Sequence, residues 1–120
     1  MSRILIVDDE PQVRLMLSIC LGRAGFDVSE AADGEEALKI NAATPVDLIV
    51  LDLLMPGMEG LETLMLLRKN RDRPRIIAIS GGSSPGVGDF LPAALKLGAD
   101  KTLKKPFHND ELIEAIHELL

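Results

Sequence analysis

Five polar side chains that could do chemistry stand at, or just beyond, the ends of short apolar runs typical of β-strands. They are an acidic pair, a single aspartate, a serine and a lysine: Asp8, Asp9, Asp52, Ser80 and Lys105. If the runs are strands of one parallel sheet, their carboxyl ends meet at the edge where open α/β sheets bind ligands. The sequence therefore predicts one polar rim made of residues far apart in the chain.

Three carboxylates on such a rim repel one another, and a divalent cation removes that conflict. Hard oxygen ligands from few protein groups suit Mg²⁺, which keeps several waters and accepts a phosphate oxygen. Lys105 can place a point charge beside another phosphate oxygen, and Ser80 can donate a hydrogen bond to a third. The set predicts a phosphoryl-transfer site. We expect Asp52 to be the nucleophile because it stands alone, whereas Asp8 and Asp9 are paired, as metal-holding groups would be.

The elements that would position these side chains alternate between strand and helix five times. Strands are expected over Ile4–Val7, Asp27–Ala31, Val46–Leu51, Arg75–Ile79 and Lys101–Leu103. Helices are expected over Pro11–Ala24, Gly34–Ala43, Glu59–Lys69, Phe90–Leu97 and Glu111–Leu120, with Asp33 capping the second and Asn109 the last. The pattern predicts an α/β fold, a doubly wound five-stranded parallel sheet with helices on both faces.

The bulk composition restricts the class of protein. The 120 residues suit one domain, residues 1–120, and the net charge of −6 disfavours direct nucleic-acid binding by that domain. The single cysteine, Cys20, cannot form an internal disulfide, so a reducing compartment fits. No signal peptide or membrane span is evident, and we expect a cytoplasmic protein with no membrane partner.

The segments around the rim residues resemble the receiver domain of bacterial response regulators, of the CheY-like superfamily. The resemblance covers the whole chain and is specific in combination. It is carried by Ile4–Glu10 (ILIVDDE), Leu51–Gly60 (LDLLMPGMEG), Gly98–Asp100 (GAD) and Lys104–Phe107 (KKPF). It implies a flavodoxin-like sheet with the strand order 2-1-3-4-5.

The resemblance also implies a role for each rim residue. Asp52 matches the phosphoacceptor, and Asp8 and Asp9 match the acidic pair that holds Mg²⁺. The matches complete the set with three more positions: the main-chain carbonyl of Leu54 as a further Mg²⁺ ligand, Ser80 as the switch hydroxyl, and Lys105 as the lysine that precedes a cis proline. The implied phosphoryl donor is a sensor histidine kinase or a histidine phosphotransfer protein. The output domain or target stays open, and dimerisation on phosphorylation is possible.

Two departures from the family's pattern affect how a signal would leave the site. The family usually has Tyr or Phe three residues before the lysine, where this chain has Thr102. The stretch between Ser80 and Lys105 is a few residues longer than usual and begins with the glycine-rich segment Gly81–Gly88. Because glycine resists rearrangement little, we expect the switch to run mainly through this segment and the start of the helix after it.

Two other functions compete with a phosphorylation switch that is not an enzyme. A phosphatase with an aspartyl-phosphate intermediate would need a second aspartate two residues beyond the nucleophile, where this chain has Leu54. It would also need a cap domain, for which the chain has no length. A scaffold that keeps the fold without phosphorylation would not need the complete set of rim residues. The sequence therefore favours the switch.

Overall fold

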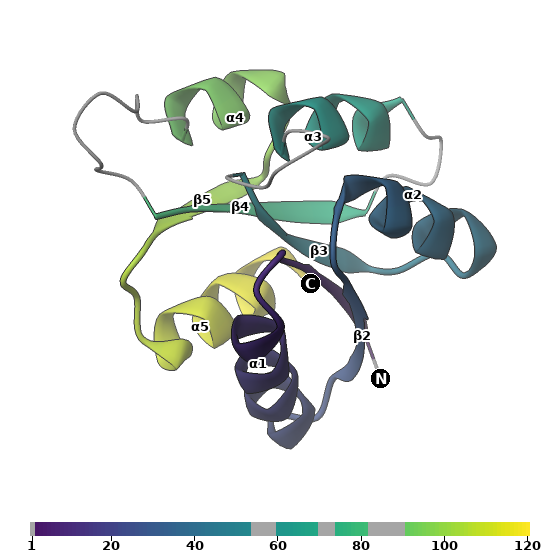
Figure 1. Ribbon diagram of the computed structural model, residues 1–120. Helices are drawn as coiled ribbons and strands as arrows, with labels where there is room; N and C mark the ends of the chain where they lie inside the picture. The colour runs from purple at the N-terminus through teal and green to yellow at the C-terminus, as the bar shows by residue number, and fades with distance from the viewer. Residues whose placement is uncertain (1, 54–59, 70–73, 82–90) are drawn as a thin grey trace.

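The computed structural model describes residues 2–53, 60–69, 74–81 and 91–120, and in these ranges strands and helices alternate along the chain. The strands are β1 (Arg3–Val7), β2 (Asp27–Ala31), β3 (Leu48–Asp52), β4 (Arg75–Ser80) and β5 (Lys101–Lys104). The helices are α1 (Pro11–Arg23), α2 (Gly34–Ala43), α3 (Gly60–Arg68), α4 (Leu91–Leu97) and α5 (Asn109–Leu119). All strand pairs are parallel, in the order β2-β1-β3-β4-β5 (Figure 1). The expected fold class and strand order are confirmed.

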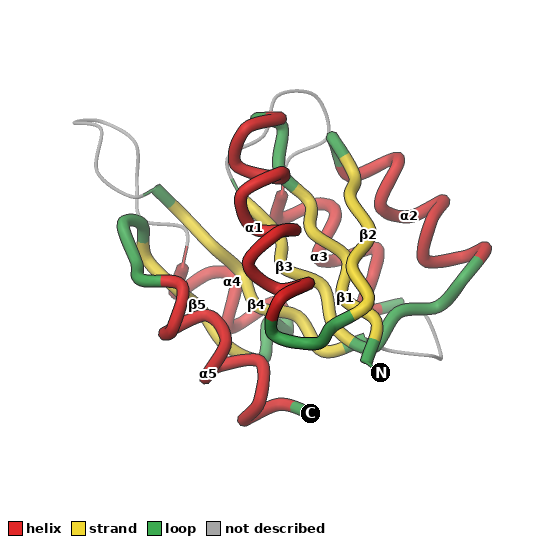
Figure 2. The backbone as a smooth tube through the Cα atoms, turned by 90° about the horizontal axis from the view of Figure 1, so that it is seen from below, coloured by secondary structure: helices red, strands yellow, loops and turns green. Residues whose placement is uncertain are grey.

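Two helical layers cover the sheet. Helices α2, α3 and α4 lie on one face, and α1 and α5 lie on the other, which is the near face in Figure 2. Successive side chains of a strand point to opposite faces, so Leu5 packs into the core under α2–α4 while Ile4 packs into the core under α1 and α5. All five residues of β3 are buried. This double burial explains why the central strands are almost continuously apolar.

Glycine and aspartate mark several helix ends. Gly25 and Gly98 follow α1 and α4 with φ angles of 97° and 114°, which lie in the left-handed region that glycine adopts without strain. Asp33 caps α2, since its Oδ1 accepts from the Glu36 N–H at 2.8 Å. The Glu36 carboxylate in turn accepts from the N–H of Ala32. The Asp33 cap agrees with the sequence prediction.

Two predicted starts, those of β3 and α5, are wrong by two residues, and the other bounds within the described residues agree to within one residue. Strand β3 begins at Leu48 rather than Val46, because the Val46 N–H donates to the buried Asn41 side chain at 3.0 Å and is used in the turn. The residue that caps α5 is His108, and Asn109 is the first helical residue. The His108 N–H donates to the Glu111 carboxylate at 3.3 Å, so the acidic residue in the first turn closes this helix end.

Some expectations lie outside the described residues. They are the Leu54 carbonyl, the first residues of the helices expected from Glu59 and Phe90, and all of the Gly81–Gly88 segment except Gly81. Among the helices that the structure describes, none has the length and apolar character needed to cross a bilayer.

Gly60 brings the start of α3 into direct contact with the end of β3. A Cβ atom on this buried glycine would lie 2.3 Å from the Leu53 Cα and 2.8 Å from the Asp52 carbonyl oxygen. Both atoms belong to the backbone and cannot move aside easily. Gly60, the last residue of the MPGMEG segment, is therefore required for packing next to the candidate site.

We expect Gly60→Ala to lower the free energy of unfolding by about 1–3 kcal/mol, the usual cost of overpacking. Gly22→Ala is the matched control, because a Cβ at this helical position meets nothing within 4 Å. It should leave stability unchanged or raise it by up to about 1 kcal/mol. Urea unfolding followed by circular dichroism suits a chain without Trp or Tyr. Equal stability of the two variants would contradict the packing argument.

An ion-pair network lies at the amino ends of the strands, opposite the edge with the predicted polar rim. It joins α3 to the α4–β5 connection. Arg68 donates to the Gly98 carbonyl at 2.6 Å, to the Pro74 carbonyl at 3.1 Å and to the Asp100 carboxylate at 2.6 Å. The same carboxylate accepts from the Ile76 N–H at 2.8 Å. Burial alone would raise the pKa of Asp100, but the hydrogen bonds from Ile76 and Arg68 and the nearby guanidinium charges lower it overall.

Because the folded-state pKa of Asp100 lies below its unfolded value, the carboxylate stabilises the fold at neutral pH. This stabilisation is lost as the pH falls from about 4 through the folded-state pKa. We expect Asp100→Asn to be less stable than wild type at pH 7, and the difference to shrink at pH 3. Urea unfolding at both pH values tests this, with the exposed Glu114→Gln as control. A difference that grows on acidification would contradict the assigned sign.

Candidate functional site

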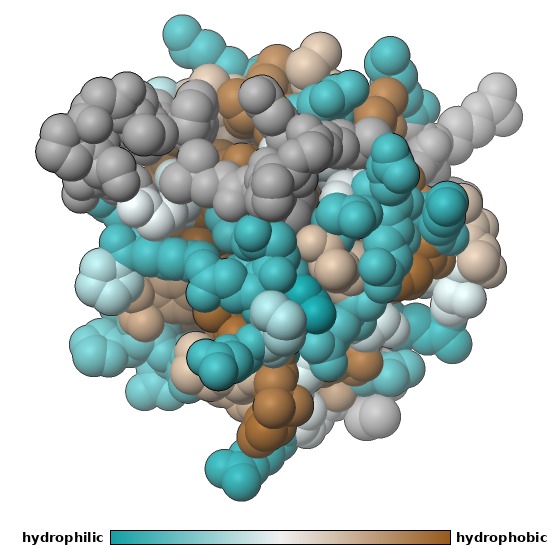
Figure 3. Space-filling view, viewed as in Figure 1, coloured by the Kyte–Doolittle hydropathy of each residue, from teal (hydrophilic) through white to brown (hydrophobic). Residues whose placement is uncertain are grey.

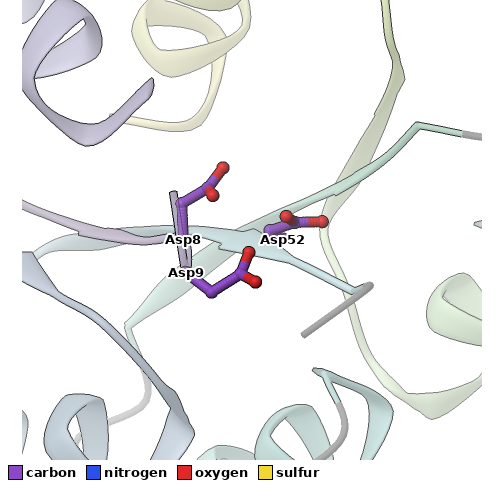
Figure 4. Close-up of side chains that lie close together, drawn as sticks. All are labelled: Asp8, Asp9 and Asp52. Carbon is purple, nitrogen blue, oxygen red and sulfur yellow. The ribbon is translucent and has the colours of Figure 1, made fainter. Parts of the chain in front are cut away.

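Asp8, Asp9 and Asp52 meet at the carboxyl edge of the sheet, as their positions after β1 and at the end of β3 predict. One carboxylate oxygen from each lies within 4.8 Å of the others. Figure 4 shows the three side chains near one another, with their carboxylates directed to the same side of the view. Asp8 and Asp52 are only 3 % and 6 % exposed, and Asp9 is the most exposed of the three. Such a buried acidic group needs nearby positive charge.

Lys105 supplies that charge. Its Nζ lies 3.5 Å from the Asp8 Oδ2 and 3.7 Å from the Asp52 Oδ2. The chain reaches this point because the Lys105 N–H donates to the Ser80 carbonyl at 2.9 Å, just beyond the last β4–β5 pair. The Lys105–Pro106 peptide bond is cis. The preceding Lys104 is exposed, so Lys105 is the lysine that faces the carboxylates, as expected.

Ser80 is the last residue of β4 and is almost completely buried, at 1 % exposure. Its hydroxyl has no hydrogen-bond partner among the described residues. The structure thus places Ser80 at the same edge of the sheet without a hydrogen bond to the carboxylates. A buried, unpartnered hydroxyl is uncommon.

Asp8 is held by contacts that leave one carboxylate oxygen facing the rim. Its N–H donates to the Ala31 carbonyl at 3.2 Å, which continues the β1–β2 ladder by one residue. Its Oδ1 accepts from the Glu10 N–H at 2.9 Å, at the start of α1. The other oxygen, Oδ2, lies 3.5 Å from the Lys105 Nζ.

A cavity of about 580 Å³ adjoins the acidic group on the α1 and α5 side of the sheet. Asp8, Asp52 and Lys105 form its polar end, and Val13 and Phe107 belong to its apolar wall. Figure 3 shows hydrophilic side chains gathered across the middle of the molecule, between the two helical layers. There is room for a small charged group next to the carboxylates.

The residues present fit a divalent cation with hard oxygen ligands. Three carboxylates against one nearby ammonium leave excess negative charge in a partly buried site. The donors are all oxygens, and they are fewer than a full coordination shell, which suits Mg²⁺ with its retained waters. Among the described residues, the cation could be held by the carboxylates of Asp9 and Asp52 and by the Oδ2 atom of Asp8. The expected Leu54 carbonyl stays a prediction because it lies outside the described residues.

The chain belongs to the family of response regulator receiver domains. The sequence pattern of that family matches residues 4–117, nearly the whole chain. The match, the sheet order and the acidic edge with its lysine agree with the resemblance seen in the sequence.

The chain is similar to transcriptional regulators and to single receiver structures. It is 42 % identical over 119 residues to the probable transcriptional regulator ycf27 of Porphyridium aerugineum, covering 99 % of this chain and 48 % of that protein. It is 38 % identical to the transcriptional regulatory protein CpxR of Escherichia coli K12, covering 100 % of this chain and 50 % of that protein. The chain thus spans about half the length of the curated relatives it matches.

Two solved structures share the fold over their full lengths. The chemotaxis protein CheY4 of Vibrio cholerae superposes with a TM-score of 0.89 at 32 % identity, covering 100 % of this chain and 99 % of that one. The response regulator TrrA of Thermotoga maritima, in complex with Mg²⁺–BeF, superposes with a TM-score of 0.88 at 38 % identity, covering both chains completely.

Proposed function

We propose that residues 1–120 form a single receiver domain that accepts a phosphoryl group on Asp52 in a Mg²⁺-dependent reaction and thereby changes its partner binding. The observation that carries this proposal is the meeting of three carboxylates with the Lys105 ammonium at the carboxyl edge of the sheet. Family membership supports it, and so does the similarity to TrrA, whose structure is a complex with Mg²⁺–BeF.

In the proposed reaction a carboxylate oxygen of Asp52 attacks phosphorus, and the bond from phosphorus to the donor's nitrogen breaks. The electron pair of that bond leaves with the donor's imidazole. Asp8, Asp9 and Asp52 would hold Mg²⁺, which would neutralise charge on the phosphoryl oxygens. Lys105 would contact a second phosphoryl oxygen from its place beside Asp52.

Ser80 would respond after transfer. The phosphoryl group adds about −1.5 to −2 charge and three acceptor oxygens. The Ser80 hydroxyl has no hydrogen-bond partner among the described residues. It could therefore turn to donate to one of these oxygens without losing a hydrogen bond to any of those residues. The route beyond Ser80, through Gly81–Gly88 rather than through Thr102, stays a prediction.

Receiver domains of this family are generally signal transducers rather than enzymes. We propose that this chain promotes only its own phosphorylation and dephosphorylation. Leu54 stands where an aspartyl-phosphate phosphatase would need its second aspartate. The burial of Asp8 and Asp52 beside Lys105 also argues against a scaffold that never binds a charged group.

We propose a sensor histidine kinase or a histidine phosphotransfer protein as the donor, in the cytoplasm. An exposed apolar patch on α1 supports a protein donor: Leu15, Met16 and Ile19 are 58 %, 54 % and 48 % exposed. The patch appears as the brown area over α1 in Figure 3, on the helix that begins at the site.

Asp52→Asn should abolish acyl phosphate formation with acetyl phosphate and Mg²⁺. The other two carboxylates of the cluster, Asp8 and Asp9, are the proposed metal ligands and would not replace Asp52 as the nucleophile. Asp9→Ala should form acyl phosphate much more slowly, since it removes a metal ligand. Asp47→Asn is the matched control. Asp47 is exposed and directly precedes β3, at the opposite end of the strand from Asp52, so this variant should react as wild type. Intact-mass measurement with hydroxylamine sensitivity provides the readout. Wild-type yield from Asp52→Asn would refute the phosphoacceptor assignment.

Ile19→Glu should slow phosphotransfer from a cognate histidine kinase by about 10-fold or more, the effect of losing about 1.4 kcal/mol of binding. The rate with acetyl phosphate should stay within about twofold of wild type, because Ile19 does not line the cavity at Asp52. Leu95→Glu, on α4 and 50 % exposed, is the matched control. If both variants slow kinase transfer equally, the α1 patch is not the donor's docking surface.

A further inference from the structure

Arg14 on α1 reaches back to the acidic edge, where it bonds to a main-chain oxygen. Its Nη1 donates to the main-chain carbonyl of Asp8 at 2.7 Å. Its Nε lies 3.5 Å from the Glu30 Oε1 on β2. The Arg14 side chain is 17 % exposed and that of Glu30 is 40 % exposed, so the guanidinium is largely enclosed. One side chain therefore joins α1, β2 and the end of β1.

The bond to the Asp8 carbonyl matters because this carbonyl belongs to the peptide unit between Asp8 and Asp9. Residue 8 is the last one paired with β2, through its N–H to Ala31. Beyond it the sheet no longer fixes the backbone, and Asp9 is the most exposed member of the cluster. The peptide plane is rigid, so holding its oxygen also fixes the positions of the Asp9 N and Cα atoms. Only the Asp9 φ angle and its side-chain rotations are then left to direct the carboxylate.

The start of α1 has few side-chain contacts. Its capping residue, Glu10, makes no side-chain hydrogen bond to the helix, and the first turn contains no acidic residue. Pro11 suits the first helical position, and the first helical backbone bond runs from the Arg14 N–H to the Glu10 carbonyl at 3.1 Å. The backbone is held there by the Glu10 N–H bond to the Asp8 Oδ1 and by the Arg14 bond to the Asp8 carbonyl. Of these two contacts, only the second leaves the Asp8 carboxylate entirely available.

We infer that Arg14, braced by Glu30, is a positioning residue that sets Mg²⁺ affinity by fixing the Asp8–Asp9 peptide, an inference that rests on the proposed Mg²⁺ site. Groups outside the metal's direct ligands commonly change metal affinity by about 10–100-fold when removed. Arg14 carries positive charge close to the cluster, so a purely electrostatic role has the opposite consequence. Removing that charge would tighten Mg²⁺ binding, and Arg14→Lys would leave binding unchanged.

Isothermal titration calorimetry with Mg²⁺ alone, on the whole chain, separates the two roles. We expect Arg14→Ala to raise the Kd for Mg²⁺ by about 10-fold or more. Arg14→Lys should also raise it, by a smaller factor, because an ammonium lacks the planar fork that contacts both acceptors. Arg23→Ala, at the exposed end of the same helix, is the control for charge and should leave the Kd within about twofold of wild type.

A Kd that is unchanged or lower in both Arg14 variants would overturn the inference. If Arg14→Ala does not fold, as judged by its thermal transition without Mg²⁺, Arg14→Lys alone decides. The experiment involves no phosphoryl donor, so its result is separable from the proposed function. If wild type binds Mg²⁺ but Asp52 takes no phosphoryl group, the proposed function fails while the role of Arg14 is still tested.

Discussion

Three carboxylates with oxygens within 4.8 Å of one another, two of them almost completely buried, repel each other and have to be held together by the rest of the fold. The parallel sheet does this by placing β1 and β3 side by side, so their carboxyl ends and the acidic residues there cannot separate. The cost is offset by burial of apolar strand residues on both faces, which contribute about 25 cal/mol per Å² of apolar surface removed from water. Apolar burial in the sheet thus compensates for the repulsion among the carboxylates at its carboxyl edge.

The two edges of the sheet have different electrostatic designs. At the opposite edge, Asp100 is satisfied by short hydrogen bonds of 2.6 Å from Arg68 and 2.8 Å from the Ile76 N–H. That network ties α3 to the α4–β5 connection. At the carboxyl edge the contacts of Lys105 are longer. The fold therefore concentrates its rigid charge pairing away from the place where a charged group has to enter.

Much of this arrangement could be predicted from the sequence because it depends on strand ends. Asp8, Asp9, Asp52 and Lys105 each follow an apolar strand, and parallel topology alone brings them together. The sequence predicts Asn109 as the cap of α5 because Asn is the better intrinsic cap, whereas the Glu111 carboxylate selects His108. The apolar Val46 extends the strand pattern and predicts an early start for β3, although its N–H is bonded to Asn41.

The contacts of Arg14 and Arg68 could not be predicted in the same way. Each guanidinium bonds to a main-chain carbonyl, of Asp8 and of Gly98 respectively. Every residue has such a carbonyl, so nothing in the residue types marks these partners. Arg68 also explains the requirement at Gly98, where a Cβ atom would lie 2.9 Å from its Nε. Long side chains that bond to backbone depend on the final packing of several elements, which periodicity and motif spacing do not describe.

The geometry of Lys105 shows why the edge remains receptive. Its Nζ lies 3.5 and 3.7 Å from the Asp8 and Asp52 oxygens, whereas a charge-assisted hydrogen bond from nitrogen to oxygen is about 2.7–2.9 Å long. At that separation the ammonium still reduces repulsion between the carboxylates, because Coulomb attraction falls only inversely with distance. It does not occupy the short-range positions on their oxygens, which a metal ion at about 2.1 Å would need. Lys105 can therefore stabilise the acidic edge before a cation arrives and remain beside it afterwards, where its charge is available to an incoming phosphoryl oxygen.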